Sequence, residues 1–182
     1  MVREWFDNAA CEQAIRDIAS GDSGALSVLY DRLHRQIYAV SWAILQNHAD
    51  AEDNLQNTLC EILKCASSFE KGKARAWVLA IARNQALHAL ESRKWVTTLT
   101  DHEDEISLSA APDSPEDTVI CMDALATLGK EEREIVVMKV YSGLKHKEIA
   151  KTLGISEDAA QKRYVRAIAK LKEYYTERGR NG

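Results

Sequence analysis

The sequence is poor in residues that interrupt helices, with only two prolines and eight glycines among 182 positions. Runs of β-branched residues are also few, and this composition favours an all-α protein. No apolar run approaches the length of a membrane span, and the opening segment MVREWFDN lacks the apolar core of a signal peptide. We therefore expect an all-α protein that acts in the cytoplasm without inserting into a membrane.

Residues that commonly bind metals are sparse and scattered. The cysteines show no CxxC spacing, and no closely paired histidines accompany them. A zinc site is therefore not expected, and reduced, partly buried thiols are the better interpretation. The cysteines in question are Cys11, Cys60, Cys65 and Cys121.

An enzyme would have to use His48, Asp50, Glu52 and Asp53 as a metal or acid–base site. Their spacing places Asp50 and Asp53 near one face of a helix. No second ligand cluster, phosphate-binding loop or nucleophile arrangement accompanies them. We expect no catalytic residues, no metal and no cofactor.

The net charge of −4 is unevenly distributed along the chain. Residues 1–63 hold 4 basic and 10 acidic side chains, whereas residues 64–94 hold 7 and 2. Residues 95–123 hold 8 acidic side chains and no basic one, and residues 124–182 hold 13 basic and 8 acidic. Two basic regions separated by an acidic stretch indicate two surfaces for a polyanion.

Apolar residues at intervals of three and four predict helices over 10–19, 26–44, 50–64 and 74–94. In the third of these, Leu55, Leu59, Ile62 and Leu63 are expected to face inward. Residues 97–118 contain both prolines and cannot build a core, so they form an interdomain linker. Further helices are expected over 122–128 and 131–141. The fold predicted is two small helical domains, 1–95 and 122–182, joined by an acidic linker, 96–121.

Residues 143–171 predict two helices joined by a tight turn at Gly154. Ser156 is placed to cap the second helix, whose inner face would carry Ala160 and Tyr164. Its outer face would carry lysine and arginine. This is the arrangement of a helix-turn-helix, although an αα-hairpin with a solvated basic face has the same periodicity.

Two groups of motifs resemble the sigma-70 family. DAEDNLQNTL at 50–59, Phe69 and RAWVLAIARNQAL at 75–87 resemble its region 2, and the segment from LATLGKEERE to AIAKLK resembles its region 4. With only a short acidic linker between them, the chain resembles an extracytoplasmic-function (ECF, group IV) sigma factor. The resemblance implies a factor that binds core RNA polymerase, recognises −35 and −10 promoter elements and opens DNA. It also implies a cognate anti-sigma factor as a partner.

The resemblance also implies residue roles. In the second helix of the hairpin, the outer side chains would face the −35 bases, with Arg163 and Lys170 near phosphate or the helix flank. Gln161 stands where the family more often has a basic residue. It can pair with adenine, or it can be a solvated helix residue. The −35 set is Ser156, Gln161, Lys162, Arg163, Val165, Arg166 and Lys170.

For the −10 element, the family uses a basic helix and the loop before it to hold a flipped base and the strand's backbone. Trp77 shares the face of Ile81 and is therefore expected in the core rather than as a stacking platform. The −10 set is Phe69, Lys71, Lys73, Arg75, Arg83, Asn84, His88 and Arg93. The acidic face that the family docks on core polymerase corresponds to Asp50, Glu52, Asp53, Gln56 and Asn57, which without the motif would be a plain solvated face.

Two questions remain open from the sequence. A stand-alone helix-turn-helix regulator would share residues 143–171, but it would need a dimerisation or effector domain and would bind free duplex DNA. The acidic linker resembles a segment that threads toward the polymerase active-site cleft and RNA exit path, or it is a spacer. If the linker threads toward the active-site cleft, replacing four of its carboxylates with serine would impair initial RNA synthesis. These residues are Asp101, Glu103, Asp104 and Glu105.

Overall fold

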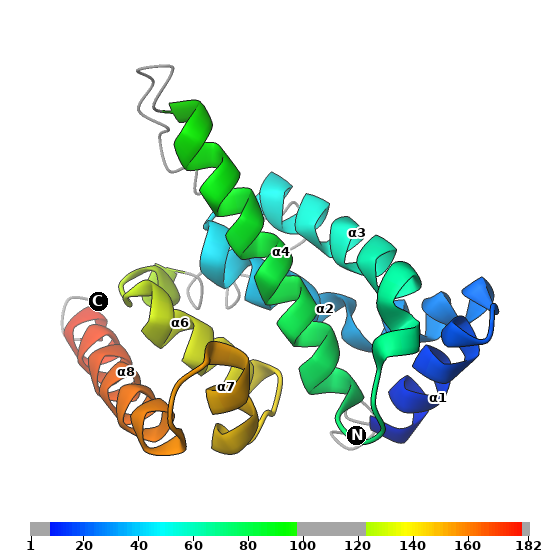
Figure 1. Cartoon of the computed structure of the whole chain (residues 1–182). Coiled ribbons are helices and arrows are strands. Elements are labelled where there is room, and N and C mark those ends of the chain that lie inside the picture. Colours follow the sequence, from blue (N-terminus) through cyan, green and yellow to red (C-terminus); the bar gives the residue numbers. More distant parts are fainter. Residues whose placement is uncertain (1–7, 98–122, 180–182) are drawn as a thin grey trace.

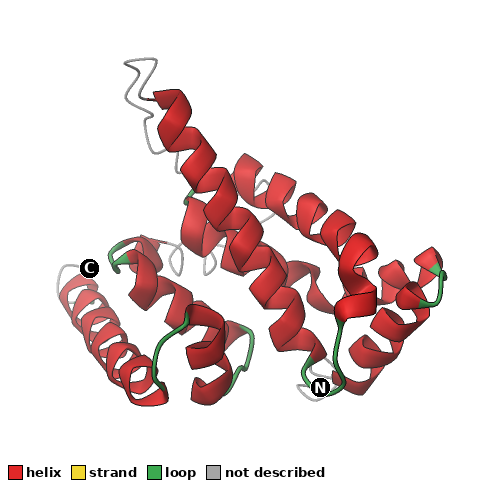
Figure 2. Ribbon diagram, in the orientation of Figure 1, coloured by secondary structure: helices red, strands yellow, loops and turns green. Residues whose placement is uncertain are grey.

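The computed structural model describes residues 8–97 and 123–179, which form helices and loops without a strand (Figure 1, Figure 2). The all-α architecture predicted from the sequence is confirmed. The expected linker 96–121 lies outside the described residues except for its first two, which extend the fourth helix. The main helices are α1 (Asn8–Ala19), α2 (Leu26–Leu45), α3 (His48–Cys65), α4 (Ala74–Thr97), α6 (Lys130–Val136), α7 (His146–Leu153) and α8 (Glu157–Arg178).

Local side-chain chemistry sets the helix boundaries in the first domain. The Asp22 carboxylate accepts the Gly24 N–H at 2.9 Å in the 3-10 turn Ser23–Ala25 that leads into α2. Gln46 ends α2 in the left-handed conformation, with φ 54°, and the Asn47 side chain then accepts the Asp50 N–H at 3.1 Å. Because Asn47 caps α3, that helix begins at His48, two residues before the predicted start.

The core of the first domain forms where α2, α3 and α4 meet, with α1 against α2 and α4. Its largest fully buried apolar side chains come from all four helices, and each contributes about 1.5–3 kcal/mol by leaving water. They are Ile15, Leu29, Leu33, Ile37, Val40, Ile62 and Leu79.

Polar side chains also lie within this core, among them Asn54 and Ser41. The Asn54 amide of α3 donates to the Ser41 hydroxyl of α2 at 2.7 Å and to the Ala82 carbonyl of α4 at 3.0 Å. Ser41 in turn donates to the Ile37 carbonyl at 2.8 Å. Asn54 therefore joins three helices through hydrogen bonds, which satisfies the amide in a buried position.

The predicted inner face of α3 is partly wrong. Its buried line runs through Ala51, Asn54, Thr58 and Ile62, while Leu63 is 40% exposed. Leu63 follows Ile62 by one residue and so points about 100° away around the helix axis. Apolar periodicity alone missed this because it considers only apolar residues, and two of the four buried positions are an asparagine and a threonine.

The second domain packs against the first. In Figure 1, α6, α7 and α8 gather beside α4, opposite the side that α3 covers. The end of α6 continues as a π-helical turn, Val137–Tyr141, and both lie against α2, while α7 lies against α4. Ile135, Met138 and Ile149 belong to the same continuous apolar cluster as the core of the first domain.

Two further findings concern the described residues. None of their helices is long and apolar enough to cross a bilayer. Three cysteines are free thiols there: Cys11 is buried, Cys65 is half-buried and Cys60 is exposed. Cys121 lies outside the described residues.

Candidate nucleic-acid interface

The turn between α7 and α8 has the chemistry that the sequence predicts. Gly154 ends α7 with φ 68° and donates its N–H to the Ala150 carbonyl, as a glycine in the left-handed region can do without strain. The Ser156 hydroxyl then accepts the Ala159 N–H at 3.1 Å and begins α8. These caps fix the direction in which α8 leaves α7.

α8 has one packed face and one free face. Ala160 and Ala167 are fully buried, with Tyr164 half-buried beside them. On the opposite side, Val165 is 60% exposed although it is apolar. The outward side chains around it are Gln161, Lys162 and Arg166, all exposed. Hydrogen-bonding, cationic and apolar groups on one rigid helix are the set that reads base edges in a major groove.

Two of the predicted −35 residues lie on the flank of α8 that faces α6. Arg163 pairs with Glu131 at 2.5 Å, and Lys170 pairs with Glu132 at 2.7 Å. The hydrogen bond from Lys170 is the main cause that lowers the pKa of Glu132. In this arrangement Arg163 and Lys170 attach α8 to α6, whereas Lys162 pairs with Asp158 of its own helix at 2.8 Å.

α4 presents a second polar surface, on which Asn84 and His88 are exposed. Near its C-terminal end, Arg93 pairs with Asp50 of α3 at 2.5 Å. This contact joins Arg93, which was predicted to bind DNA, to Asp50, which was predicted to bind polymerase. Asp50 is half-buried, whereas Glu52 and Asp53, the next acidic residues of α3, are exposed.

The loop before α4 holds an aromatic pair. Phe69 meets Trp77 edge to face, with ring centroids 5.3 Å apart, and both rings pack on the apolar core. Trp77 is thus half-buried against the core, as expected. Lys71 and Lys73 are exposed at the end of this loop, and Arg75 is half-buried in the first turn of α4.

Two cations of the predicted −10 set contact carboxylates of the second domain. Arg83 Nε donates to Glu134 Oε2 of α6 at 2.7 Å, with the two side chains 18% and 1% exposed. Lys73 pairs with Glu148 of α7 at 3.5 Å. Sequence reasoning missed both contacts because they join residues far apart in the chain, and no local pattern marks the acidic partners.

The outward face of α3 is acidic and rich in amides. Glu52, Asp53, Gln56 and Asn57 are all exposed there. Of the group assigned to polymerase, Asp50 pairs with Arg93 of α4. The remaining four residues form a surface that cannot attract DNA but can dock a basic protein surface.

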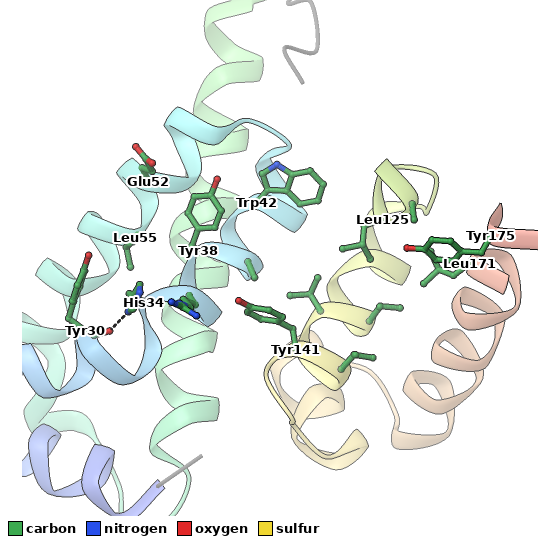
Figure 3. A pocket seen from close by; sticks show the side chains of 16 residues that line it. Tyr30, His34, Tyr38, Trp42, Glu52, Leu55, Leu125, Tyr141, Leu171 and Tyr175 are labelled. Atoms are coloured by element: carbon green, nitrogen blue, oxygen red, sulfur yellow. Dashed lines mark hydrogen bonds between the residues drawn. The ribbon is translucent and has the colours of Figure 1, made fainter. Parts of the chain in front are cut away.

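An apolar groove of about 550 Å³ lies between the two domains (Figure 3). Tyr38 and Trp42 of α2 form one wall, and Leu125, Tyr141 and Tyr175 of the second domain form the other. The Tyr38 hydroxyl is hydrogen-bonded to His48 Nδ1, and burial, with the Glu52 carboxylate, raises the pKa of Tyr38. The sequence analysis did not predict this groove, because it exists only when the two domains meet.

The comparisons with known proteins agree with this geometry. The family model described as sigma-70 region 2 matches residues 29–96, and the model described as sigma-70, region 4 matches residues 120–171. The chain belongs to the sigma-70 family of RNA polymerase sigma factors. The region 2 match leaves the stand-alone regulator without support, since that alternative explained only the helix-turn-helix.

Curated relatives named ECF RNA polymerase sigma factors place the chain in that group. It is 32% identical to the RNA polymerase sigma factor CarQ of Myxococcus xanthus over 157 residues, which is 84% of this chain and 90% of CarQ. The fold is similar to that of the sigma factor RpoE solved with the anti-sigma factor NepR from Bartonella quintana. The TM-score is 0.75 at 24% identity, covering 82% of this chain and 96% of that one. It is also similar to CnrH, solved with the cytosolic domain of CnrY, with a TM-score of 0.69 at 22% identity and coverage of 92% and 98%.

Proposed function

We propose that this ECF sigma factor reads the −35 element with the outer face of α8. The observation that carries the proposal is the free face itself, where Gln161, Val165 and Arg166 project from a helix that Ser156 caps. An arginine can bond two acceptors of guanine, a glutamine can bond adenine, and an exposed valine can contact the methyl group of thymine. Arg163 and Lys170 have a positioning role, since they pair with carboxylates of α6.

We assign binding of the −10 strand to α4 and the loop before it. Asn84 and His88 offer exposed hydrogen-bonding groups, and Lys71, Lys73 and Arg83 supply the positive charge that follows a backbone. Phe69 lies at the edge of this surface against Trp77, where it supports the loop. Opening of the duplex then follows from capture of unstacked bases on this surface.

Core RNA polymerase is assigned to the acidic face of α3. Glu52, Asp53, Gln56 and Asn57 are exposed together on α3, and Glu52 also lines the interdomain groove. The factor works in the cytoplasm, where polymerase and promoter DNA meet. It supplies recognition and DNA opening, and the polymerase supplies the chemistry.

A cognate anti-sigma factor is assigned to the interdomain groove. Of the solved relatives described above, RpoE was crystallised with the anti-sigma factor NepR, and CnrH was solved with the cytosolic domain of CnrY. In this chain, the large apolar side chains Tyr30, Val140, Tyr141 and Tyr175 are exposed along the groove. An amphipathic helix that lays its apolar face into such a groove would cover them.

Run-off transcription with purified core polymerase on a library of promoter sequences tests the proposal. We expect transcripts from a subset of promoters that share a −35 and a −10 element. Arg166→Ala should reduce transcription from that subset, and the loss should depend on the base at one −35 position. A factor that gave no transcript above core polymerase alone, or an Arg166→Ala variant with unchanged promoter preference, would contradict it.

A further inference from the structure

A pair of opposite charges lies on the outer face of α8, at the end where the helix begins. The Asp158 carboxylate and the Lys162 ammonium are 2.8 Å apart, and each side chain is 72% exposed. Residues four apart lie on one side of a helix, so the pair shares the outer face with Val165 and Arg166. In Figure 1, α8 lies on the outer side of the second domain, with α6 and α7 between it and α4. The pair is therefore part of the surface that we assign to the −35 element.

The contact between the two side chains leaves most of their bonding capacity unused. A carboxylate has several lone-pair sites and an ammonium has several N–H donors, and the contact between Asp158 and Lys162 uses one of each. Ion pairs this exposed add little to stability, because water and salt screen both charges. An isolated carboxylate on this face would be repelled by DNA phosphates, and the ammonium beside it offsets that repulsion. The pair can therefore approach a duplex and bond to it.

The major-groove edge of a G·C base pair has the complementary arrangement. Its guanine O6 is an acceptor and its cytosine N4 is a donor. These two atoms are joined by a Watson–Crick hydrogen bond, so they lie about 2.9 Å apart. The Asp158 oxygen and the Lys162 nitrogen are separated by nearly the same distance, 2.8 Å. The ammonium can thus donate to O6 while the carboxylate accepts from N4 of the same base pair.

An A·T base pair fits this pair of charges less well. It also offers a donor beside an acceptor, but an ammonium placed over thymine O4 would meet the C5-methyl group. A carboxylate placed over the adenine amino group would approach N7, which is another acceptor. Over G·C, by contrast, the ammonium meets the two acceptors of guanine, O6 and N7, and the carboxylate meets the amino group of cytosine. The groups that flank the central donor and acceptor therefore favour G·C.

We propose that Asp158 and Lys162 act together to select a G·C base pair at one position of the −35 element, with guanine bonded to Lys162 and cytosine to Asp158. A helix rises about 1.5 Å per residue, so the middle of the pair lies about 9 Å from Arg166 along α8. This distance corresponds to about two or three base pairs. The inference rests on the proposal that the outer face of α8 reads the −35 element. It adds Asp158 to the reading residues and names the base pair.

Transcription by the polymerase holoenzyme from promoters randomised across the −35 element tests this assignment. For wild type, we expect G·C to be preferred about tenfold over the other base pairs at one position. In Asp158→Ala this preference should fall below about twofold, while the preference at the position read by Arg166 is kept, because separated positions contribute independently. The control, Glu157→Ala, removes the neighbouring exposed carboxylate from the same first turn and should keep both preferences. Circular dichroism should show unchanged helix content in both variants, since both side chains are exposed.

The same measurements separate failure of the pair from failure of the α8 assignment. If Asp158→Ala kept the G·C preference, or lowered transcription from every promoter equally, the pair would only stabilise the start of α8 and the proposal would be overturned. Lys162→Ala should weaken the preference at the same position as Asp158→Ala, and a change at a different position would also overturn it. If Arg166→Ala altered the −35 preference and neither variant of the pair did, only the pair would be excluded. If none of the three variants altered it, the assignment of α8 itself would be wrong.

Discussion

Arg133 of α6 donates from Nε to the carbonyl of Ala43, 2.7 Å away in the last turn of α2. Carbonyls in this turn lack partners within the helix, and a cation there also favours the negative end of the helix dipole. One side chain therefore completes the C-terminus of a helix in the other domain. Burial lowers the pKa of Arg133, and the Glu134 carboxylate opposes that effect.

Arg133→Met should weaken the contact between the domains. Methionine keeps an apolar stem of similar length but removes the hydrogen bond to the Ala43 carbonyl, and a hydrogen bond of a charged group contributes about 1.5–3 kcal/mol. We expect faster amide hydrogen exchange in the last turn of α2 and in α6, with helix content unchanged by circular dichroism. Exchange rates equal to wild type would show that this contact does not hold the domains together.

Asp53→Arg should weaken binding to core polymerase without affecting folding. Asp53 is exposed on the acidic face of α3, so the change reverses a charge without disturbing the core. The measurement is co-purification with core polymerase at fixed salt. Asp31→Arg, which reverses an exposed charge on α2, serves as the control and should bind as wild type. If Asp53→Arg bound core polymerase as strongly as wild type, the acidic face of α3 would not be part of the polymerase interface.

Arg166→Ala and Lys170→Ala should differ, although both remove a cation from α8. Arg166 lies on the outer face, so its loss should cost about 1–3 kcal/mol of −35 recognition at one base position. Lys170 pairs with Glu132, so its loss should weaken the attachment of α8 to α6 and affect all promoters alike. Transcription from a cognate promoter and its single-base −35 variants distinguishes the two. Base-specific loss in Lys170→Ala would reverse the assigned roles.

Asn54→Ala should lower the free energy of unfolding by about 1–3 kcal/mol. The reason is that the hydrogen bonds from the side-chain amide to Ser41 and Ala82 are lost within the core. Urea denaturation followed by circular dichroism gives the value. Asn57→Ala, one helical turn away on the exposed face, should change it by less than about 0.5 kcal/mol. Similar losses in both variants would mean that the buried amide has no special role.

Protonation of His146 should make the free energy of unfolding depend on pH. Burial and the Lys139 ammonium lower its pKa below the ordinary 6.5, while Glu157 acts weakly the other way. The unfolded chain then binds a proton more readily than the folded one, so stability is full above about pH 6.5 and falls as the pH drops from there through the folded pKa. Urea unfolding at pH 7.5 and 5.5 should show this loss in wild type and a smaller one in His146→Gln. An equal loss in His146→Gln would exclude His146 as the cause.

Local patterns predicted the helices and their caps well. Gly154 and Ser156 identified the turn before α8, and the outward position of Val165 followed from helical periodicity alone. The partners of Arg83 and Lys73 could not be found in this way. Their carboxylates are 51 and 75 residues away along the chain, and the contacts depend on how two domains dock rather than on any local sequence signal.

The burial of Asn54 was missed for a different physical reason. An asparagine on a helix is normally assigned to the solvated side, and only the approach of α2 and α4 supplies its partners. Leu63 was misplaced as a result, since the true buried line passes through Asn54 and Thr58. Polar residues that are satisfied within a core therefore shift an apparent apolar face by about one residue.

The hydrogen bonds of Asn54 also fix the position of α3 along α2 and α4. If α3 slid by one turn, about 5.4 Å, the amide would leave both acceptors and lie unpaired in an apolar setting. The exposed carboxylates of α3 and the polar side chains of α4 are consequently held at one fixed offset. If polymerase binds α3 and the −10 strand binds α4, as proposed, this fixed offset holds the two bound partners in constant alignment.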